Sequence, residues 1–383
     1  MLSGCTGLNY IKVESGNSVY DSRENCNALI ETKNNSLIYG CKNTIIPNGV
    51  ATIENTAFQG CTGLTSITIP NSVTSINRWA FNGCTNLNYI KVESGNSVYD
   101  SRDNCNAIIE TKSNTLMLGC KNSIIPNSVT SIGRYAFREC TGLTSITIPN
   151  SITVIEDEAF YDCKLENIFT KNSKTAFKES PFSDRTYQHA MLYIPEGTWS
   201  DAVYEGDWYR FNNIRETAVE AGKLSASRAY MLMDTNTFGY AVYDDASNEV
   251  KMAKAFYSID EQDLNNCWQV KTQGGQKYLY NLGAKEYASV SADGRLTLSA
   301  VPSVVRLTET DNGITLGSDA SHQWAFVKNG SQPDVTGIEA PAVSYDEEAV
   351  SYYSLGGQRL AQPRKGLVIK KTADGKSRKV MVR

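Results

Sequence analysis

Apolar positions return at a fixed distance through the first half of the chain, and residues 57–81 show the pattern most clearly. Matching aromatic and cysteine positions recur at one constant spacing, as Phe58 and Phe81, Cys61 and Cys84, Phe137 and Phe160, and Cys140 and Cys163. A period of this length is typical of a repeat protein, in which each unit stacks on its neighbours. The first half of the chain is therefore predicted to be a solenoid.

Each repeat must change direction several times, because its apolar spacing fits neither one helix nor one long strand. Residues 64–69 alternate between apolar and polar side chains, which predicts a short strand. The Pro-Asn-Ser sequence at 70–72 breaks that strand, and residues 73–76 begin a second extended piece. A single repeat leaves its apolar side in water, so only stacking gives it a core.

The repeat consensus LxxIxIPxSVxxIxxxAFxxC resembles the leucine-rich repeats of BspA-like bacterial surface proteins. The proline, Ala-Phe and cysteine positions recur together, and the resemblance extends over residues 1–216. It implies a leucine-rich repeat solenoid on a secreted or cell-surface protein that acts in adhesion. The partners that it implies are host extracellular-matrix or plasma proteins, or the surface of another microbe.

A longer period is superimposed on the short one, because the segment that begins at Cys5 returns almost unchanged from Cys84. We interpret this long period as one short turn and one longer turn, the longer one carrying an insert from roughly Glu93 to Lys121. The two halves of the insert predict strands that flank a turn at 111–114. Such inserts typically project from one face of the stack.

The two ends of the repeat region differ from its middle. Residues 1–5 align with residues 57–61, so the sequence begins inside a repeat, and we expect an export signal and further repeats upstream. After Cys163 the consensus decays into an aromatic-rich segment. We expect this segment to cap the open edge of the core with four bulky side chains, Trp199, Trp208, Tyr209 and Phe211.

Residues 217–332 predict a separate all-β module, because short apolar segments alternate with turns that contain Gly and Asp. The predicted strands are 229–233, 240–243, 268–271, 277–281, 295–299 and 324–328. The segments around Trp268 and Trp324 resemble the Gln-x-Trp strands of ricin-type β-trefoils, which implies carbohydrate binding. Each tryptophan has two open roles, a place in the core or a platform for a ligand.

Residues 333–383 predict a linker followed by a short β tail with strands near Leu355, at 367–371 and at 379–383. The tail resembles the small C-terminal β-domains of exported Bacteroidetes proteins, some of which act as sorting signals. From Tyr353 onward it holds nine Lys or Arg residues and one acidic residue. This basic character indicates either a solvated face or a contact with transport machinery or anionic glycan.

Composition and charge argue against several classes of protein, namely disordered, nucleic-acid-binding, membrane-spanning and enzymatic ones. The chain has 383 residues, of which 41% are hydrophobic and 20% charged, as in globular proteins. A net charge of −4 gives no reason to expect a nucleic acid as partner, and no apolar run is long enough for a membrane span. The two histidines, His189 and His322, lie in different predicted domains. We therefore expect no enzyme, no catalytic residues, no metal and no cofactor.

The ten cysteines contain no CxxC pair, which argues against a zinc ribbon or a thioredoxin-like site. Those at the shared repeat position, such as Cys61 and Cys84, are expected to be free and buried. Cys26 with Cys41 and Cys105 with Cys120 flank the predicted hairpins. Each of these two pairs either forms a cross-strand disulfide or is separated by a one-residue shift in register.

The predicted ligand-binding residues alternate with buried Leu and Ile along the first strand of each turn, so they point outward in one ladder. They are Tyr10, Lys12, Ser66, Thr68, Tyr89, Lys91, Ser145 and Thr147. Tyrosine is favoured at binding hot spots, although Tyr and Thr also suit exposed strands by propensity alone.

The predicted fold class is mainly β, a leucine-rich repeat solenoid followed by a small all-β, β-trefoil-like module and a short β tail. Two functions stay open. In the first, a monomeric surface protein binds host or microbial macromolecules through the solenoid. In the second, the module binds surface glycan and the repeats act as a spacer.

Overall fold

The computed structural model describes residues 7–218, 224–226, 228–253, 260, 263–291, 295–310, 313–317, 319 and 322–328, and four strand backbones beyond them. The chain divides into two compact units, Met1–Ile214 and Arg215–Arg383, here called the solenoid unit and the C-terminal unit. Among the described residues no helix is both long and apolar enough to cross a bilayer. The predicted division into three domains stays a prediction.

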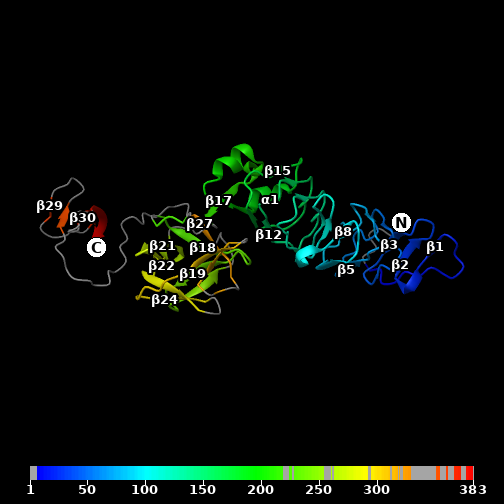
Figure 1. Cartoon of the computed structure of the whole chain (residues 1–383), viewed down its shortest axis with the longest axis horizontal. Helices are drawn as coiled ribbons and strands as arrows, with labels where there is room; N and C mark the ends of the chain where they lie inside the picture. Colours follow the sequence, from blue (N-terminus) through cyan, green and yellow to red (C-terminus); the bar gives the residue numbers. More distant parts are fainter. Residues whose placement is uncertain are drawn as a thin grey trace. The chain divides into compact units, whose positions relative to one another are not determined.

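The solenoid unit is built on two ladders of short parallel strands (Figure 1). The first ladder pairs β5 with β7 and, separately, β12 with β14 and β16: Ser66–Ile69, Tyr89–Val92, Ser145–Ile148, Asn167–Thr170 and Met191–Pro195. The second ladder pairs β4 with β6, and β11 with β13 and β15: Thr52–Ile53, Ser75–Ile76, Ser131–Ile132, Val154–Ile155 and Ala176–Phe177. Parallel pairing between successive turns confirms the predicted mainly β solenoid.

Two hairpins interrupt the regular turns, as the sequence predicts. Their strands are β1 to β3 and β8 to β10: Tyr20–Asp21, Ala28–Glu31, Ser36–Gly40, Tyr99–Asp100, Ile108–Glu110 and Thr115–Leu118. The last strand of each hairpin pairs in parallel with the solenoid, β3 with β4 and β10 with β11. The expectation that the hairpins project from the stack is therefore wrong, because their alternating apolar side chains, such as Ile30 and Leu37, are buried in the common core.

The long period contains three turns rather than the two that the sequence suggests. The same backbone turn occurs after Pro47, Pro70, Pro126 and Pro149, where each proline carbonyl accepts a hydrogen bond from the amide three positions later. Pro47 and Pro126 thus mark turns that the consensus does not reveal, because no strand precedes them. The longer of the two predicted solenoid turns is in fact two turns of the solenoid, one that contains the hairpin and one of the regular kind.

Stacked phenylalanine rings run through the core. The ring centroids of Phe58 and Phe81 lie 5.0 Å apart, with an interplanar angle of 4°. The corresponding values are 4.9 Å and 9° for Phe137 and Phe160, and 5.1 Å and 5° for Phe160 and Phe182. The hairpin turns supply glycine at this position, Gly40 and Gly119. A methyl group added to either glycine would overlap the ring of Phe58 or Phe137.

The cysteines that flank the hairpins are free thiols, so the disulfide alternative is wrong. In the first hairpin Ala28 pairs with Gly40, and extension of this register places Cys41 opposite Asn27 rather than Cys26. The Cys41 sulfur accordingly lies 3.4 Å from the Asn27 carbonyl oxygen. In the second hairpin Cys120 lies 3.6 Å from the Asn106 carbonyl oxygen. The one-residue shift in register separates both pairs.

The end of the solenoid unit is covered by α1 and two short helices, Asp184–His189, Asp201–Glu205 and Trp208–Arg210. Trp208 and Phe211 are buried, and Trp208 packs edge-on against Phe177 at 4.8 Å. Trp199 and Tyr209 are exposed instead. Two of the four predicted cap aromatics therefore cover the core edge, and the other two do not.

The larger part of the C-terminal unit is an antiparallel β-structure, with strands from β17, which begins at Asn213 just before the unit boundary, to β27. They are Asn213–Ala218, Tyr230–Asp234, Tyr240–Asp244, Glu249–Ala253, Trp268–Gln273, Gln276–Asn281, Glu286–Val290, Leu296–Ser299, Leu307–Thr310, Gly313–Leu316 and Trp324–Lys328. All six predicted strands are present. Trp268 and Trp324 are buried in one apolar cluster, so the core role is confirmed for both. The β-trefoil assignment stays a prediction.

Short 3-10 helices lie at Arg23–Asn25, Arg102–Asn104 and Leu264–Asn266. The β tail forms a four-stranded antiparallel sheet from β28 to β31, Ser351–Tyr353, Arg359–Leu360, Gly366–Lys371 and Ser377–Val382. The predicted linker, from 332 to 346, and Leu355 lie outside the described residues.

Candidate functional site

Four residues of the predicted ligand face lie on the paired strands β5 and β7. Along β5, Ser66 and Thr68 are exposed, whereas Ile67 and Ile69 are buried. Parallel pairing sets Ser66 beside Tyr89 and Thr68 beside Lys91. Neighbouring strands lie about 4.8 Å apart. Four predicted residues therefore form a compact outward patch.

The other four predicted residues do not extend this patch as a hydrogen-bonded ladder. Tyr10 and Lys12 are exposed, but the segment that carries them is not a strand. Ser145 and Thr147 lie on β12, where they are partly buried and pair with β14 rather than β7. The prediction of one continuous ladder is therefore wrong.

Side-chain amides take the place of the missing strand between β7 and β12. The Asn106 Oδ1 atom accepts a hydrogen bond from the Ile90 amide at 2.6 Å, and its Nδ2 atom donates to the Asn88 carbonyl oxygen at 2.8 Å. Asn122 donates to the same carbonyl oxygen at 3.3 Å. These bonds satisfy one backbone group in β7 and one just before it, groups that a neighbouring strand would otherwise pair.

Two exposed residues on this face were missed in the sequence, Ile45 and Ile124. Each precedes a buried isoleucine and a proline, so it occupies the repeat position of Thr68 and Lys91. The hairpin repeats read Ile-Ile-Pro where regular repeats read Thr-Ile-Pro, and this difference was the available signal. We call the ten residues at these outward positions the outer row: Tyr10, Lys12, Ile45, Ser66, Thr68, Tyr89, Lys91, Ile124, Ser145 and Thr147.

Large apolar side chains recur along the outer row. The exposed fractions are 61% for Tyr10, 75% for Ile45, 51% for Tyr89 and 66% for Ile124. Tyr89 and Ile124 repeat Tyr10 and Ile45 in the second copy of the long period. Exposed apolar side chains flanked by lysine and hydroxyl groups are typical of protein-binding surfaces.

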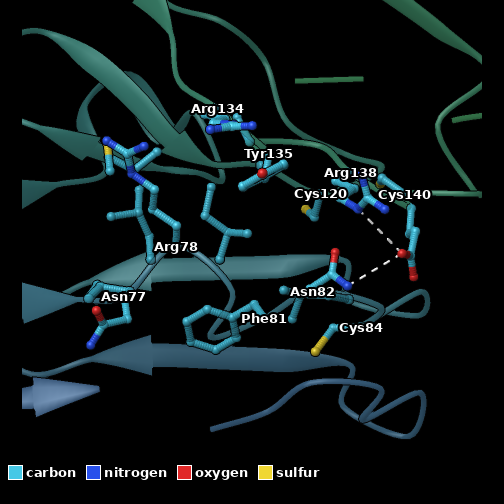
Figure 2. A pocket seen from close by; sticks show the side chains of 18 residues that line it. Asn77, Arg78, Phe81, Asn82, Cys84, Cys120, Arg134, Tyr135, Arg138 and Cys140 are labelled. Atoms are coloured by element: carbon cyan, nitrogen blue, oxygen red, sulfur yellow. Dashed lines mark hydrogen bonds and ion pairs between the residues drawn. The ribbon is translucent and has the colours of Figure 1, made fainter. Parts of the chain in front are cut away.

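A small pocket of about 40 Å³ lies inside the solenoid, where Gly119 interrupts the phenylalanine stack. Figure 2 shows Asn82 and Arg138 converging on one carboxylate, that of Glu139, at 3.3 and 3.5 Å. The buried Asn82 Oδ1 atom has no hydrogen-bond partner among the described residues. A polar space of this size suits a buried water molecule and is too small for an organic ligand.

Titratable side chains of the described residues form no metal-binding cluster, and two of the thiols have raised pKa values. The described residues contain no group of three or more His, Cys, Asp or Glu side chains arranged to hold a metal ion. Burial raises the pKa of Cys105 to about 11 and that of Cys140 to about 12, which keeps both thiols protonated at neutral pH.

The repeats match a known family. The profile described as BspA type Leucine rich repeat region matches in six copies, over residues 31–116 and 108–198. No curated protein matches the chain.

Several solved structures are similar to part of the chain. A leucine rich cell surface protein from Faecalibacterium prausnitzii is 26% identical with a TM-score of 0.32, and the match covers 44% of this chain and 52% of that chain. A leucine-rich repeat protein from Bacteroides ovatus is 20% identical with a TM-score of 0.25, covering 46% and 53%. The leucine-rich repeat protein of T. pallidum is 18% identical with a TM-score of 0.27, covering 52% and 99%. The chain spans about half the length of the first two proteins.

Proposed function

Because residues 31–198 match a BspA-type leucine-rich repeat region, we propose that this protein binds a macromolecular partner through its solenoid. The outer row is the proposed site, and the protein acts at the cell surface or after secretion, as a monomer and without catalysis. Partners of the kind implied by the repeat resemblance are host extracellular-matrix or plasma proteins, or proteins on another microbe.

The repetition of exposed apolar side chains is the observation that carries this proposal. Tyr10 with Ile45, and Tyr89 with Ile124, present the same chemistry twice on one face. Exposed Lys12 and Lys91 accompany them. Aromatic anchors provide most of the affinity in protein interfaces, and lysines at the rim favour an acidic partner.

Binding to immobilised fibronectin, fibrinogen and collagen tests the proposal. The variant in which Tyr10, Lys12, Tyr89 and Lys91 are all changed to Ala should bind at least tenfold more weakly, because loss of hot-spot side chains costs about 1–2 kcal/mol each. Ile45→Ser with Ile124→Ser should weaken binding as well. Tyr204→Ala is the matched control, since Tyr204 is 82% exposed and lies outside the outer row. Equal binding by the quadruple variant and the control would place the site elsewhere.

We propose glycan binding by the C-terminal unit as the second candidate function. Burial of Trp268 and Trp324 means that no sugar can stack on their ring faces as on an exposed platform. An open cavity of about 490 Å³ favours this candidate. A glycan array with the full chain tests it, and the outer-row variant should retain any glycan binding that the array detects.

A further inference from the structure

A cavity of about 490 Å³ opens within the C-terminal unit, lined by β20, β24 and the start of β27. Small-molecule sites commonly enclose about 300–1,000 Å³, so the cavity is large enough for one sugar residue. Val250, Met252 and Leu298 give it an apolar wall. The space is therefore a mixed surface rather than a polar crevice.

Trp324 lines this cavity and carries a buried donor. The residue is 1% exposed, and its Nε1 atom has no hydrogen-bond partner among the described residues. By contrast, the equally buried Trp268 donates from Nε1 to the Ala241 carbonyl oxygen at 2.8 Å. A buried donor without an acceptor costs about 1–3 kcal/mol. A ligand oxygen would remove this cost if a shift of the lining side chains admitted it to the Nε1 atom.

The other polar residues that line the cavity are Asn248, Glu249, Arg295, Thr297 and His322. The His322 ring stacks on Trp324 at 5.7 Å, and its Nδ1 atom lies 2.9 Å from the Oδ2 atom of Asp319, a buried carboxylate that fixes the ring. Arg295 adds a guanidinium group. The cavity thus gathers an indole N–H, an imidazole, a guanidinium and the Glu249 carboxylate. This set favours a ligand that carries both an acidic group, which can pair with Arg295, and hydroxyl groups, which can donate to Glu249.

We propose that this cavity binds a carboxylated monosaccharide of the hexuronic or sialic acid class, either free or at the end of a glycan. The apolar wall suits the carbon face of the sugar ring, and the donors suit its carboxylate and hydroxyl groups. The proposal rests on the second candidate function, glycan binding by the C-terminal unit, and assigns it a site and a ligand class.

Calorimetric titration of the full chain tests the assignment with glucuronic acid and N-acetylneuraminic acid, against glucose and N-acetylglucosamine. The acids should bind and the neutral sugars should bind at least tenfold more weakly. Arg295→Gln should weaken acid binding about tenfold or more, the effect of losing one charge-assisted hydrogen bond. Arg306→Gln is the matched control, because Arg306 is exposed in the same unit and does not line the cavity.

Trp324→Phe tests the indole donor directly and should also weaken acid binding about tenfold. Trp268→Phe controls for the loss of a buried indole, since it breaks an internal bond and should leave ligand affinity unchanged. NMR spectroscopy gives a further test. In the unchanged protein, the indole N–H resonance of Trp324, assigned from its loss in Trp324→Phe, should change its chemical shift when glucuronic acid is added.

Two results would overturn the assignment. One is no binding, at millimolar concentration, of either the free acids or glycan chains that end in them; the other is acid affinity that neither Arg295→Gln nor Trp324→Phe changes. Neutral glycans that bind the unit independently of these residues would retain the second candidate function and reject this cavity as its site. Acid-bearing glycan chains that bind while free acids do not would identify the chain end as the source of the ligand and support the assignment.

Discussion

At the scale of single residues, two glycines decide how the hairpin turns fit into the aromatic core. Gly119 lies under the Phe137 ring, and an added methyl group would overlap that ring. Its φ angle is not in the left-handed region, so the ring alone opposes a side chain. Gly40 makes the same contact with Phe58 in the first copy of the long period.

Gly119→Ala should therefore lower the unfolding free energy of the solenoid by about 1–3 kcal/mol, the usual cost of overpacking. Urea unfolding measures the loss. Gly142→Ala is the control, because its added methyl would meet the flexible Lys121 side chain instead of a ring. In a Phe137→Leu background, Gly119→Ala should lower the unfolding free energy by a smaller amount. An equal loss in both backgrounds would show that contact with the Phe137 ring does not cause the destabilisation.

Buried thiols give a prediction about high pH. The Cys140 thiol has its pKa raised by burial from about 9 to about 12, so the unfolded chain loses this proton at a lower pH than the folded chain. Between these values the unfolded state binds fewer protons, and stability falls as pH rises, by up to about 1.4 kcal/mol per pH unit for one thiol. The stability contributed by the protonated thiol is complete below about pH 9.

Thermal unfolding at pH 8 to 11 should show Tm falling with pH, and less steeply in Cys140→Ala than in the unchanged protein. Parallel curves for the two proteins would show that Cys140 does not contribute. Alkylation at pH 8 should leave Cys140 unmodified until the chain is unfolded, because thiolate is the reactive form.

Residue-level features were the least predictable from the sequence. The free Cys26 and Cys41 follow from a pairing that is shifted by one residue, and alternation of apolar residues does not define register to one residue at a strand end. Ile45 and Ile124 stand where the consensus expects a polar residue, and only alignment of the proline turns shows that they lie on the outer row.

At the scale of elements, β5 shows how the sequence determines a strand. Ile67 is 3% exposed and belongs to the apolar cluster of the N-terminal turns. Ile67→Asp should lower the unfolding free energy of the solenoid by about 4 kcal/mol or more, because it buries an unpaired charge. Thr68→Asp, on the opposite face of β5, should change stability by about 0.5 kcal/mol at most.

Calorimetry provides the measurement. Because the two units are compact separately, the transition of the C-terminal unit should persist in Ile67→Asp. Loss of both transitions together would show that the units unfold as one.

Strands of the regular turns and of the C-terminal unit were predictable because their apolar alternation, proline breaks and glycine turns are local signals. The hairpins were recognised as elements, but their place in the stack was not. Strand β3 pairs in parallel with β4, so that Ser36 lies beside Thr52 and Leu37 beside Ile53. The local pattern of apolar and polar residues does not reveal such a pairing between separate segments. The same holds for Asn106, whose side chain substitutes for a strand beside β7.

At the scale of the whole molecule, repetition extends one small surface into a long one. Each turn adds a few outward side chains, and the long period sets Tyr and Ile together twice. Stacking of repeats therefore gives a broad outward face, which is what the proposed binding of a macromolecular partner requires. A cavity suited to a small ligand occurs instead in the C-terminal unit.

The β tail provides the last prediction, at the level of export. Strands β30 and β31 pair along their full length, from Gly366 with Val382 to Lys371 with Ser377, and the sequence there is strongly basic. A folded basic sheet after a predicted linker suits recognition by transport machinery, because the machinery can bind the sheet itself and need not bind the solenoid. Deletion of Leu355–Arg383 from the chain, expressed behind a signal peptide in a Bacteroidetes host, should lower the surface-bound or secreted fraction several-fold.

Changing the solenoid instead, by Ile45→Ser and Ile124→Ser, should leave that fraction unchanged. Circular dichroism of the deletion variant should show the repeats still folded, and unchanged surface levels with folded repeats would exclude the tail as a sorting signal.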